Sequence, residues 1–70
     1  MTTHPHARAL LAFFKHNHLP EPLATVSEPF CRLANKVAAT LHGPEATVCL
    51  RKLLEAKDCA VRAKIAEDGS

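Results

Sequence analysis

Residues 23–41, LATVSEPFCRLANKVAATL, decide the fold class, because apolar side chains recur there every three or four positions. Side chains at this spacing share one face of an α-helix. The apolar line consists of Leu23, Val26, Phe30, Leu33, Val37 and Leu41. Pro22 stands just before it and suits the first turn of a helix, so the pattern predicts one that ends near residue 41.

Pro29 lies inside this predicted helix. A proline in a helix interior removes one backbone hydrogen bond and displaces the chain. Two interpretations are therefore open: one helix kinked at Pro29, or a short turn followed by a helix that Ser27 caps. The apolar line keeps its phase across Pro29, which favours the kinked helix.

Helical patterns also precede and follow this segment. Residues 5–15 carry apolar side chains at helical spacing, but a helix this short must dock on another element to persist. Gly43 can take the left-handed conformation that ends a helix, and Pro44 can open the next one, which runs to about residue 66. A connection this short makes the two longer helices antiparallel.

The composition points the same way. Among 70 residues there are twelve Ala and nine Leu, only two Gly, and neither Tyr nor Trp. Ala and Leu are strong helix formers, whereas an α/β fold needs several strands and Gly-rich turns. We therefore expect an all-α fold: a short N-terminal helix and connector in residues 1–19, a two-helix hairpin in residues 20–66 and a tail in residues 67–70.

The third predicted helix has two apolar lines. Leu50, Leu54, Val61 and Ile65 form one, and Ala46, Cys49, Leu53, Ala56 and Ala60 form the other. One line can pack on the preceding helix, and the alanine-rich line would face water in a monomer. A chain this short hides only ~60% of its unfolded surface, so we expect a homo-oligomer whose partner chain completes the core. The alternative is that the first helix covers this surface alone.

The charge excludes some partners. Nine Lys and Arg against seven Asp and Glu leave a formal net charge of +2, far from the basic stripe of a protein that binds nucleic-acid polymers. Acidic residues interleaved along the third helix also weigh against a helix-turn-helix DNA binder. No apolar run approaches the ~20 residues of a membrane span, so we expect no membrane partner and a cytoplasmic location. The three cysteines are expected to be reduced.

The chain contains five histidines and three cysteines, which are candidate metal ligands and catalytic residues. His4-x-His6 and His16-x-His18 could each approach a metal, but they lie in a terminus and a loop, and the chain has no Cys-x-x-Cys pair. Ser27 and the cysteines lack a motif that would supply a base and an oxyanion donor. We therefore expect no metal, no cofactor and no enzymatic activity.

The cations are more informative. Arg32 and Lys36 stand four apart on the outer face of the second predicted helix, and Arg51, Lys52 and Arg62 are spread along the third. In an antiparallel hairpin, cations from both helices can converge, and guanidinium groups bind phosphate bidentately. The alternative is a solvated face with weak ion pairs between residues four apart, here Arg51–Glu55 and Asp58–Arg62.

Two stretches carry a resemblance to a known family. Residues 50–65, LRKLLEAKDCAVRAKI, preceded by HGPEATVC, resemble a two-helix hairpin of small phage proteins, and residues 18–41 fit its first helix. These proteins look like the anti-CBASS sponge family, whose hairpin domain is shared with an anti-Thoeris sponge. The resemblance covers roughly residues 18–66.

The resemblance implies a non-enzymatic protein that sequesters cyclic di- or trinucleotide messengers of bacterial anti-phage immunity in the host cytosol. It also implies a compact helical hexamer with nucleotide pockets between protomers. An aromatic side chain ahead of the hairpin stacks a base in that family, and here Phe14, His16 or His18 must serve. A lysine of the first hairpin helix holds phosphate there, and Arg32 or Lys36 corresponds to it. On charge and helix position, Arg51, Lys52 and Arg62 are further phosphate candidates. The alternative function is an oligomeric helical adaptor without a small ligand.

Overall fold

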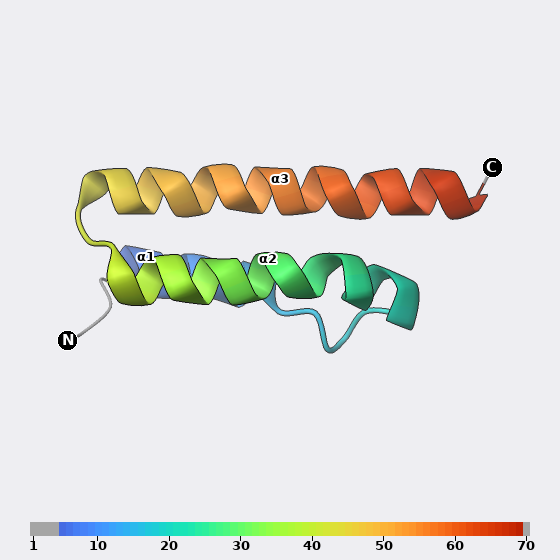
Figure 1. Cartoon of the computed structure of the whole chain (residues 1–70), viewed down its shortest axis with the longest axis horizontal. Coiled ribbons are helices and arrows are strands. Elements are labelled where there is room, and N and C mark those ends of the chain that lie inside the picture. The colour runs from blue at the N-terminus through green and yellow to red at the C-terminus, as the bar shows by residue number, and fades with distance from the viewer. Residues whose placement is uncertain (1–4, 70) are drawn as a thin grey trace.

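The computed structural model describes residues 5–69 of the chain, and the side chains of residues 8–68. Three α-helices and one 3₁₀ turn follow one another: α1 (Pro5–Leu11), η1 (Ala12–Phe14), α2 (Glu21–Thr40) and α3 (Pro44–Gly69). No strand occurs among residues 5–69, so the expected all-α class is confirmed. Helices α2 and α3 lie side by side and run in opposite directions, with α1 behind α2 (Figure 1).

Helix α2 continues through Pro29 as a single helix, so the interpretation with a short turn before a separate helix is wrong. Pro29 is exposed at the surface of α2. At the start of the helix, the backbone N–H groups of Leu23 and Ala24 donate to the carbonyl oxygen of Pro20, at 3.0 and 2.9 Å. The hydroxyl of Thr25 donates to the carbonyl oxygen of Glu21 at 2.9 Å.

The turn between α2 and α3 depends on Gly43. Its φ of +97° lies in the left-handed region that costs other residues energy, so the expected glycine conformation is confirmed. The N–H groups of Ala46 and Thr47 donate to the Gly43 carbonyl oxygen, at 3.1 and 3.3 Å, and begin α3. At its other end α3 extends to Gly69, so residues 67–69, expected as a tail, belong to the helix.

The core lies where η1, α2 and α3 meet. Its buried members are Phe14, Ala34, Val37, Ala38 and Leu50, and half-buried apolar side chains of α1 and the two long helices surround them. This arrangement corrects the apolar line predicted for α2, because Leu33 and Leu41 are 48% and 52% exposed. Helix α2 packs against both η1 and α3, which also contact each other. Its buried stripe is therefore centred on the small residues Ala34 and Ala38.

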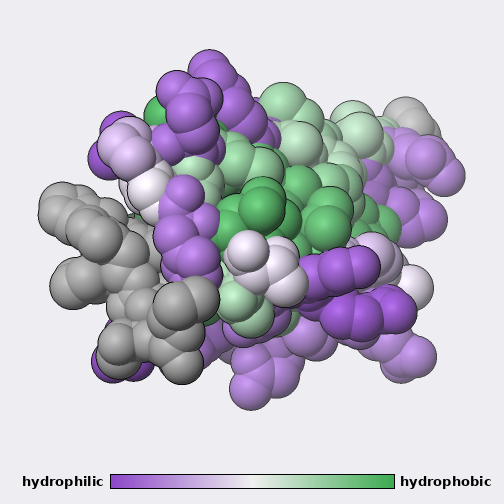
Figure 2. Space-filling model, turned by 60° about the vertical axis from the view of Figure 1, so that its left-hand side comes forward, coloured by the Kyte–Doolittle hydropathy of each residue, from purple (hydrophilic) through white to green (hydrophobic). Residues whose placement is uncertain are grey.

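One side of the α2–α3 pair carries apolar residues that α1 does not cover. We call it the apolar face, and it consists of Phe30 and Leu33 on α2 with Cys49, Leu53, Ala56 and Ala60 on α3. Leu33, Cys49 and Ala56 are exposed, and the other three are half-buried. Figure 2 shows a continuous apolar region between hydrophilic borders on this side.

Two surface pockets locate this face relative to α1. Val26 of α2 and Lys64 of α3 line one pocket, so the helix rows that continue from them, toward Phe30 and Ala60, flank the same side of the pair. His16, in the connector that follows η1, instead lines a pocket with Ala24 and Glu28. The connector thus leaves η1 along the opposite edge of α2, which agrees with α1 lying behind the pair in Figure 1.

Candidate functional site

The most suitable anion site among the described residues is a surface pocket on α3. It has a volume of about 460 Å³, is open to solvent, and is lined by Val48, Arg51, Lys52, Leu54 and Glu55. Residues three and four apart on a helix project toward the same side, which brings these side chains together. Val48 and Leu54 supply apolar surface, and Arg51 and Lys52 supply positive charge.

The ion pairs on α3 leave the guanidinium group of Arg51 free to bind an anion, because its neighbouring carboxylate pairs with Lys52. Glu55 pairs with Lys52, with 3.7 Å between Nζ and Oε2, and both side chains are largely exposed. A surface pair of this kind is worth little, so Lys52 can still turn toward an anion. Arg51 has no ion pair with a described side chain. The expected pair Arg51–Glu55 is therefore wrong, because Glu55 lies beside Lys52 instead.

The expected pair Asp58–Arg62 is also absent between these two described residues. Asp58 pairs with Lys57, with 2.9 Å between Nζ and Oδ1. Arg62 instead donates from Nη2 to the Sγ of Cys59, at 3.4 Å and one turn back on α3. Arg62 is exposed, but it does not line the pocket of Arg51 and Lys52.

The α2 cations lie elsewhere. Arg32 and Lys36 are exposed one turn apart on α2, and neither lines the α3 pocket. Arg32 donates from Nε and Nη2 to the two carboxylate oxygens of Glu28, at 2.9 and 2.5 Å. These hydrogen bonds lower the pKa of Glu28 and raise the pKa of Arg32. A single chain therefore does not bring the α2 and α3 cations together in this pocket.

The aromatic candidates separate by burial. Phe14 is completely buried in the core, so its ring has no free face for a base. Phe13, its neighbour, is 62% exposed and is the aromatic that sequence reasoning missed. Both lie in η1, and the apolar spacing of residues 5–15 pointed only to Phe14. Because the ring of Phe13 is exposed, it has a face that a base could reach.

Two of the described histidines, His16 and His18, differ in their surroundings. His18 is exposed in the connector. His16 is half-buried, and its Nδ1 is buried without a hydrogen-bond partner. It lines a pocket of about 320 Å³ together with Glu21 and Glu28, and its charge contributes to the lowered pKa of Glu28. Two carboxylates make this pocket unsuitable for phosphate.

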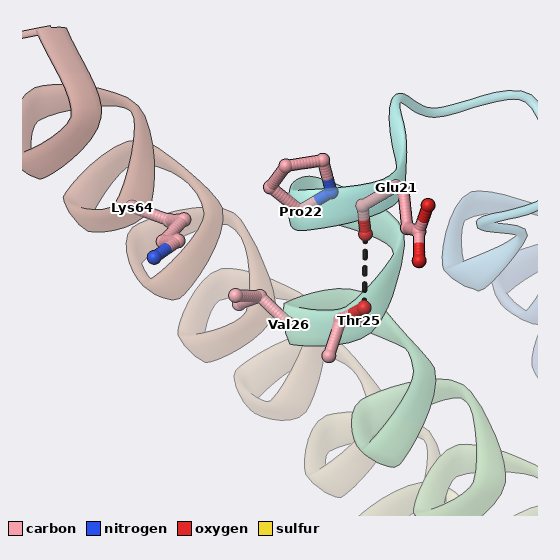
Figure 3. A pocket seen from close by; sticks show the side chains of 5 residues that line it. All are labelled: Glu21, Pro22, Thr25, Val26 and Lys64. Atoms are coloured by element: carbon pink, nitrogen blue, oxygen red, sulfur yellow. Dashed lines mark hydrogen bonds between the residues drawn. The ribbon is translucent and has the colours of Figure 1, made fainter.

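A third pocket, of about 440 Å³, lies between the start of α2 and the end of α3 (Figure 3). Pro22 and Val26 form its apolar part, with Glu21 and Lys64 at its edges. Lys64 already lies 3.8 and 3.4 Å from the carboxylates of Glu67 and Asp68. The start of α2 offers few free N–H groups, because Pro22 has none and the next two are bonded to Pro20. An anion is therefore poorly held there.

The described residues form neither a metal-binding cluster nor a membrane-spanning helix. Among the described side chains, no group of three or more His, Cys, Asp and Glu could hold a metal ion. His4 and the side chain of His6 lie outside the described residues. Within residues 5–69, no helix is both long and apolar enough to span a bilayer. Comparison with protein-family models, curated proteins and solved structures finds no match to this chain.

Proposed function

We propose that this protein is a non-enzymatic sponge that binds cyclic di- or trinucleotides and so withholds them from bacterial anti-phage signalling in the host cytosol. One observation carries the proposal: Arg51, which has no carboxylate partner among the described side chains, lines an open pocket beside apolar Val48 and Leu54. The resemblance of residues 18–66 to sponge hairpins suggests this class of ligand.

The pocket offers two of the interactions that such a ligand needs. A guanidinium fork holds two phosphate oxygens at once, and the ammonium of Lys52 adds a mobile positive charge. The apolar side chains give a base or ribose a surface from which water is displaced. A volume of about 460 Å³ is within the usual size of small-molecule sites, roughly 300–1,000 Å³.

The other candidate residues contact the ligand only when several chains assemble. In the proposed homo-oligomer, for which the resemblance suggests six protomers, Arg32, Lys36 and Arg62 contribute phosphate contacts from surfaces outside this pocket. We propose Phe13 as the ring that stacks a base, in place of the buried Phe14, with His16 and His18 beside it in sequence. An open pocket that a neighbouring chain completes needs no deep cleft within 70 residues.

Sequestration then follows from mass action. A sponge removes messenger only when the protein concentration exceeds both the messenger concentration and the dissociation constant. Pre-ordered cations lower the entropy lost on binding, which favours high affinity. No bond in the ligand is made or broken, so no catalytic base, nucleophile or metal is required.

Titration calorimetry with a panel of cyclic dinucleotides and trinucleotides tests this function directly. We expect saturable binding of at least one member at micromolar protein, with the intact nucleotide recovered after the protein is denatured. Heat from none of the panel members would refute the sponge. Recovery of a hydrolysed nucleotide would instead show an enzyme.

A second function is favoured by a separate observation. The apolar face of α2 and α3 is typical of a protein that acts by docking other helices, as an adaptor without a small ligand. The two functions differ in one measurement. An adaptor associates through this face and leaves every cyclic nucleotide free in solution, whereas the sponge depletes at least one.

A further inference from the structure

We infer that guanine is the base that this protein recognises, and that Glu55 is the residue that selects it. The inference rests on the proposed function and deepens it, because it names the base of the nucleotide in the α3 pocket. Among the described residues that line this pocket, beside Arg51 and Lys52, Glu55 is the only carboxylate. A carboxylate repels phosphate, so the part of the ligand next to Glu55 must donate hydrogen bonds rather than carry negative charge.

The carboxylate oxygens of Glu55 are free to accept hydrogen bonds from a ligand. The Nζ of Lys52 lies 3.7 Å from its Oε2, beyond the ~3.2 Å at which an N–H group and an oxygen form a hydrogen bond. The Glu55 side chain is 66% exposed, and an exposed ion pair of this kind contributes little to stability. A ligand can therefore separate Glu55 from Lys52 at small cost.

Guanine is the common base whose hydrogen-bonding edge matches a carboxylate. An ionised carboxylate only accepts hydrogen bonds, through two oxygens side by side. Guanine presents two adjacent donors, the ring N1–H and the exocyclic amino group, so it fills both oxygens of Glu55 at once. Adenine and cytosine place an unprotonated ring nitrogen beside their amino group, and uracil places its N–H between two carbonyl oxygens. Each of these three bases directs a lone pair at the carboxylate.

Binding of a guanine nucleotide exchanges the partners within the pocket and leaves each charge paired. The guanine edge takes the place of Lys52 at Glu55, and the phosphate takes the place of Glu55 at Lys52. Arg51 holds the same phosphate through its guanidinium fork. Residues four apart on a helix have Cβ atoms about 5–6 Å apart, so Arg51 and Glu55 are close enough for one nucleotide to contact both. Val48 and Leu54 line the same pocket and offer apolar surface to the base and ribose.

Calorimetry with four cyclic dinucleotides that differ only in their bases tests the inference. Cyclic di-GMP, di-AMP, di-UMP and di-IMP share one sugar–phosphate ring and one charge. Hypoxanthine, the base of cyclic di-IMP, is guanine without the exocyclic amino group. We expect cyclic di-GMP to bind at least roughly tenfold more tightly than each of the other three, because each of them loses a hydrogen bond to a charged group.

Glu55→Gln probes the selecting residue itself. Glutamine has the same size, but it lacks the charge and has one oxygen in place of two. The variant is expected to lose the preference for guanine. Glu45→Gln is the matched control, because Glu45 is an exposed carboxylate on α3 outside the pocket, and it is expected to keep the wild-type preference. Circular dichroism verifies that both variants retain their helix content.

The outcomes separate this inference from the sponge. Equal affinities of the wild type for the four ligands, or an undiminished preference for guanine in Glu55→Gln, overturn guanine selection by Glu55. Saturable binding of any of the four leaves the sponge standing in either case. If none of the four binds, guanine recognition is overturned as well, and the wider panel with cyclic trinucleotides then decides whether the sponge falls with it.

Discussion

Phe13 and Phe14 are neighbours in the 3₁₀ turn η1, yet the ring of Phe14 is completely buried while that of Phe13 is 62% exposed. Consecutive side chains on a helical turn point in different directions, so one ring enters the core and the other faces solvent. This relationship assigns the two residues different tasks. Phe14 packs the N-terminal segment against α2 and α3, and the exposed ring of Phe13 is the one that we propose stacks a base.

We expect alanine substitutions to separate these tasks. Phe14→Ala removes a buried ring and lowers the free energy of unfolding by about 3–5 kcal/mol, measured by urea denaturation. Phe13→Ala changes it by less than ~0.5 kcal/mol, as is usual for surface positions. In calorimetry, the Phe13 variant loses about 1–3 kcal/mol of nucleotide binding, the usual value of one stacked base. Equal stability losses in both variants would contradict the assignment.

Arg51→Ala is expected to weaken nucleotide binding by about 1.5–3 kcal/mol, the usual value of hydrogen bonds to a charged group. That corresponds to a dissociation constant roughly ten- to a hundredfold higher. Arg8→Ala is the matched control, because Arg8 is an exposed cation on α1 outside the α3 pocket. If the two variants bind equally well, Arg51 is not a phosphate ligand.

The Glu28–Arg32 pair predicts a pH dependence. Hydrogen bonds from Arg32 lower the pKa of Glu28 below its ordinary value of 4.5 in the folded protein. The pair therefore stabilises α2 above pH 4.5, and this stabilisation is lost as the pH falls through the lowered pKa. An NMR titration of the Glu28 carboxyl group measures that pKa directly.

The control for the titration is Arg32→Gln. It removes the charge and the bidentate hydrogen bonds, so the pKa of Glu28 should rise toward 4.5. Because the pair lies at the surface, with the Arg32 and Glu28 side chains 73% and 41% exposed, added salt should also weaken it. A Glu28 carboxyl that titrates at 4.5 in the wild type would show that the pair does not persist in solution.

Pro29→Ala is expected to stabilise the protein. Proline in a helix interior costs up to about 3 kcal/mol relative to alanine, and Pro29 is exposed, so its removal leaves no cavity. The new N–H can donate to the carbonyl oxygen of Thr25, one turn earlier. Urea denaturation should show a higher midpoint with an unchanged slope. A lower midpoint would mean that Pro29 is needed for the shape of α2.

Much of the fold could be read from local patterns. The spacing from Leu23 to Val37 predicted the long helix, and Gly43 with Pro44 marked the turn before α3, because both signals depend only on near neighbours in sequence. The end of α3 was placed too early. Residues 67–69 contain no apolar side chain, so nothing in the pattern signalled that the helix continues there.

The candidate site was less predictable. Arg51 and Lys52 were identified from charge and position, and the structure places both in one pocket. The ion pairs along α3 were not predicted correctly, because carboxylates one, three and four residues away compete for each cation. The side-chain rotamers decide which pair forms. Glu55 therefore joins Lys52, although Arg51 stands at the helical spacing that usually favours pairing.

The sequence by itself determined the elements of this protein: which segments are helical, where the chain turns, and that one helix carries more apolar surface than one neighbour can cover. These follow from propensity and periodicity, which act over a few residues. Only the tertiary structure decided which residues are hidden. The placement of η1 buried Phe14, exposed Phe13 and Leu33, and left the apolar face uncovered, because burial depends on which helices meet in space.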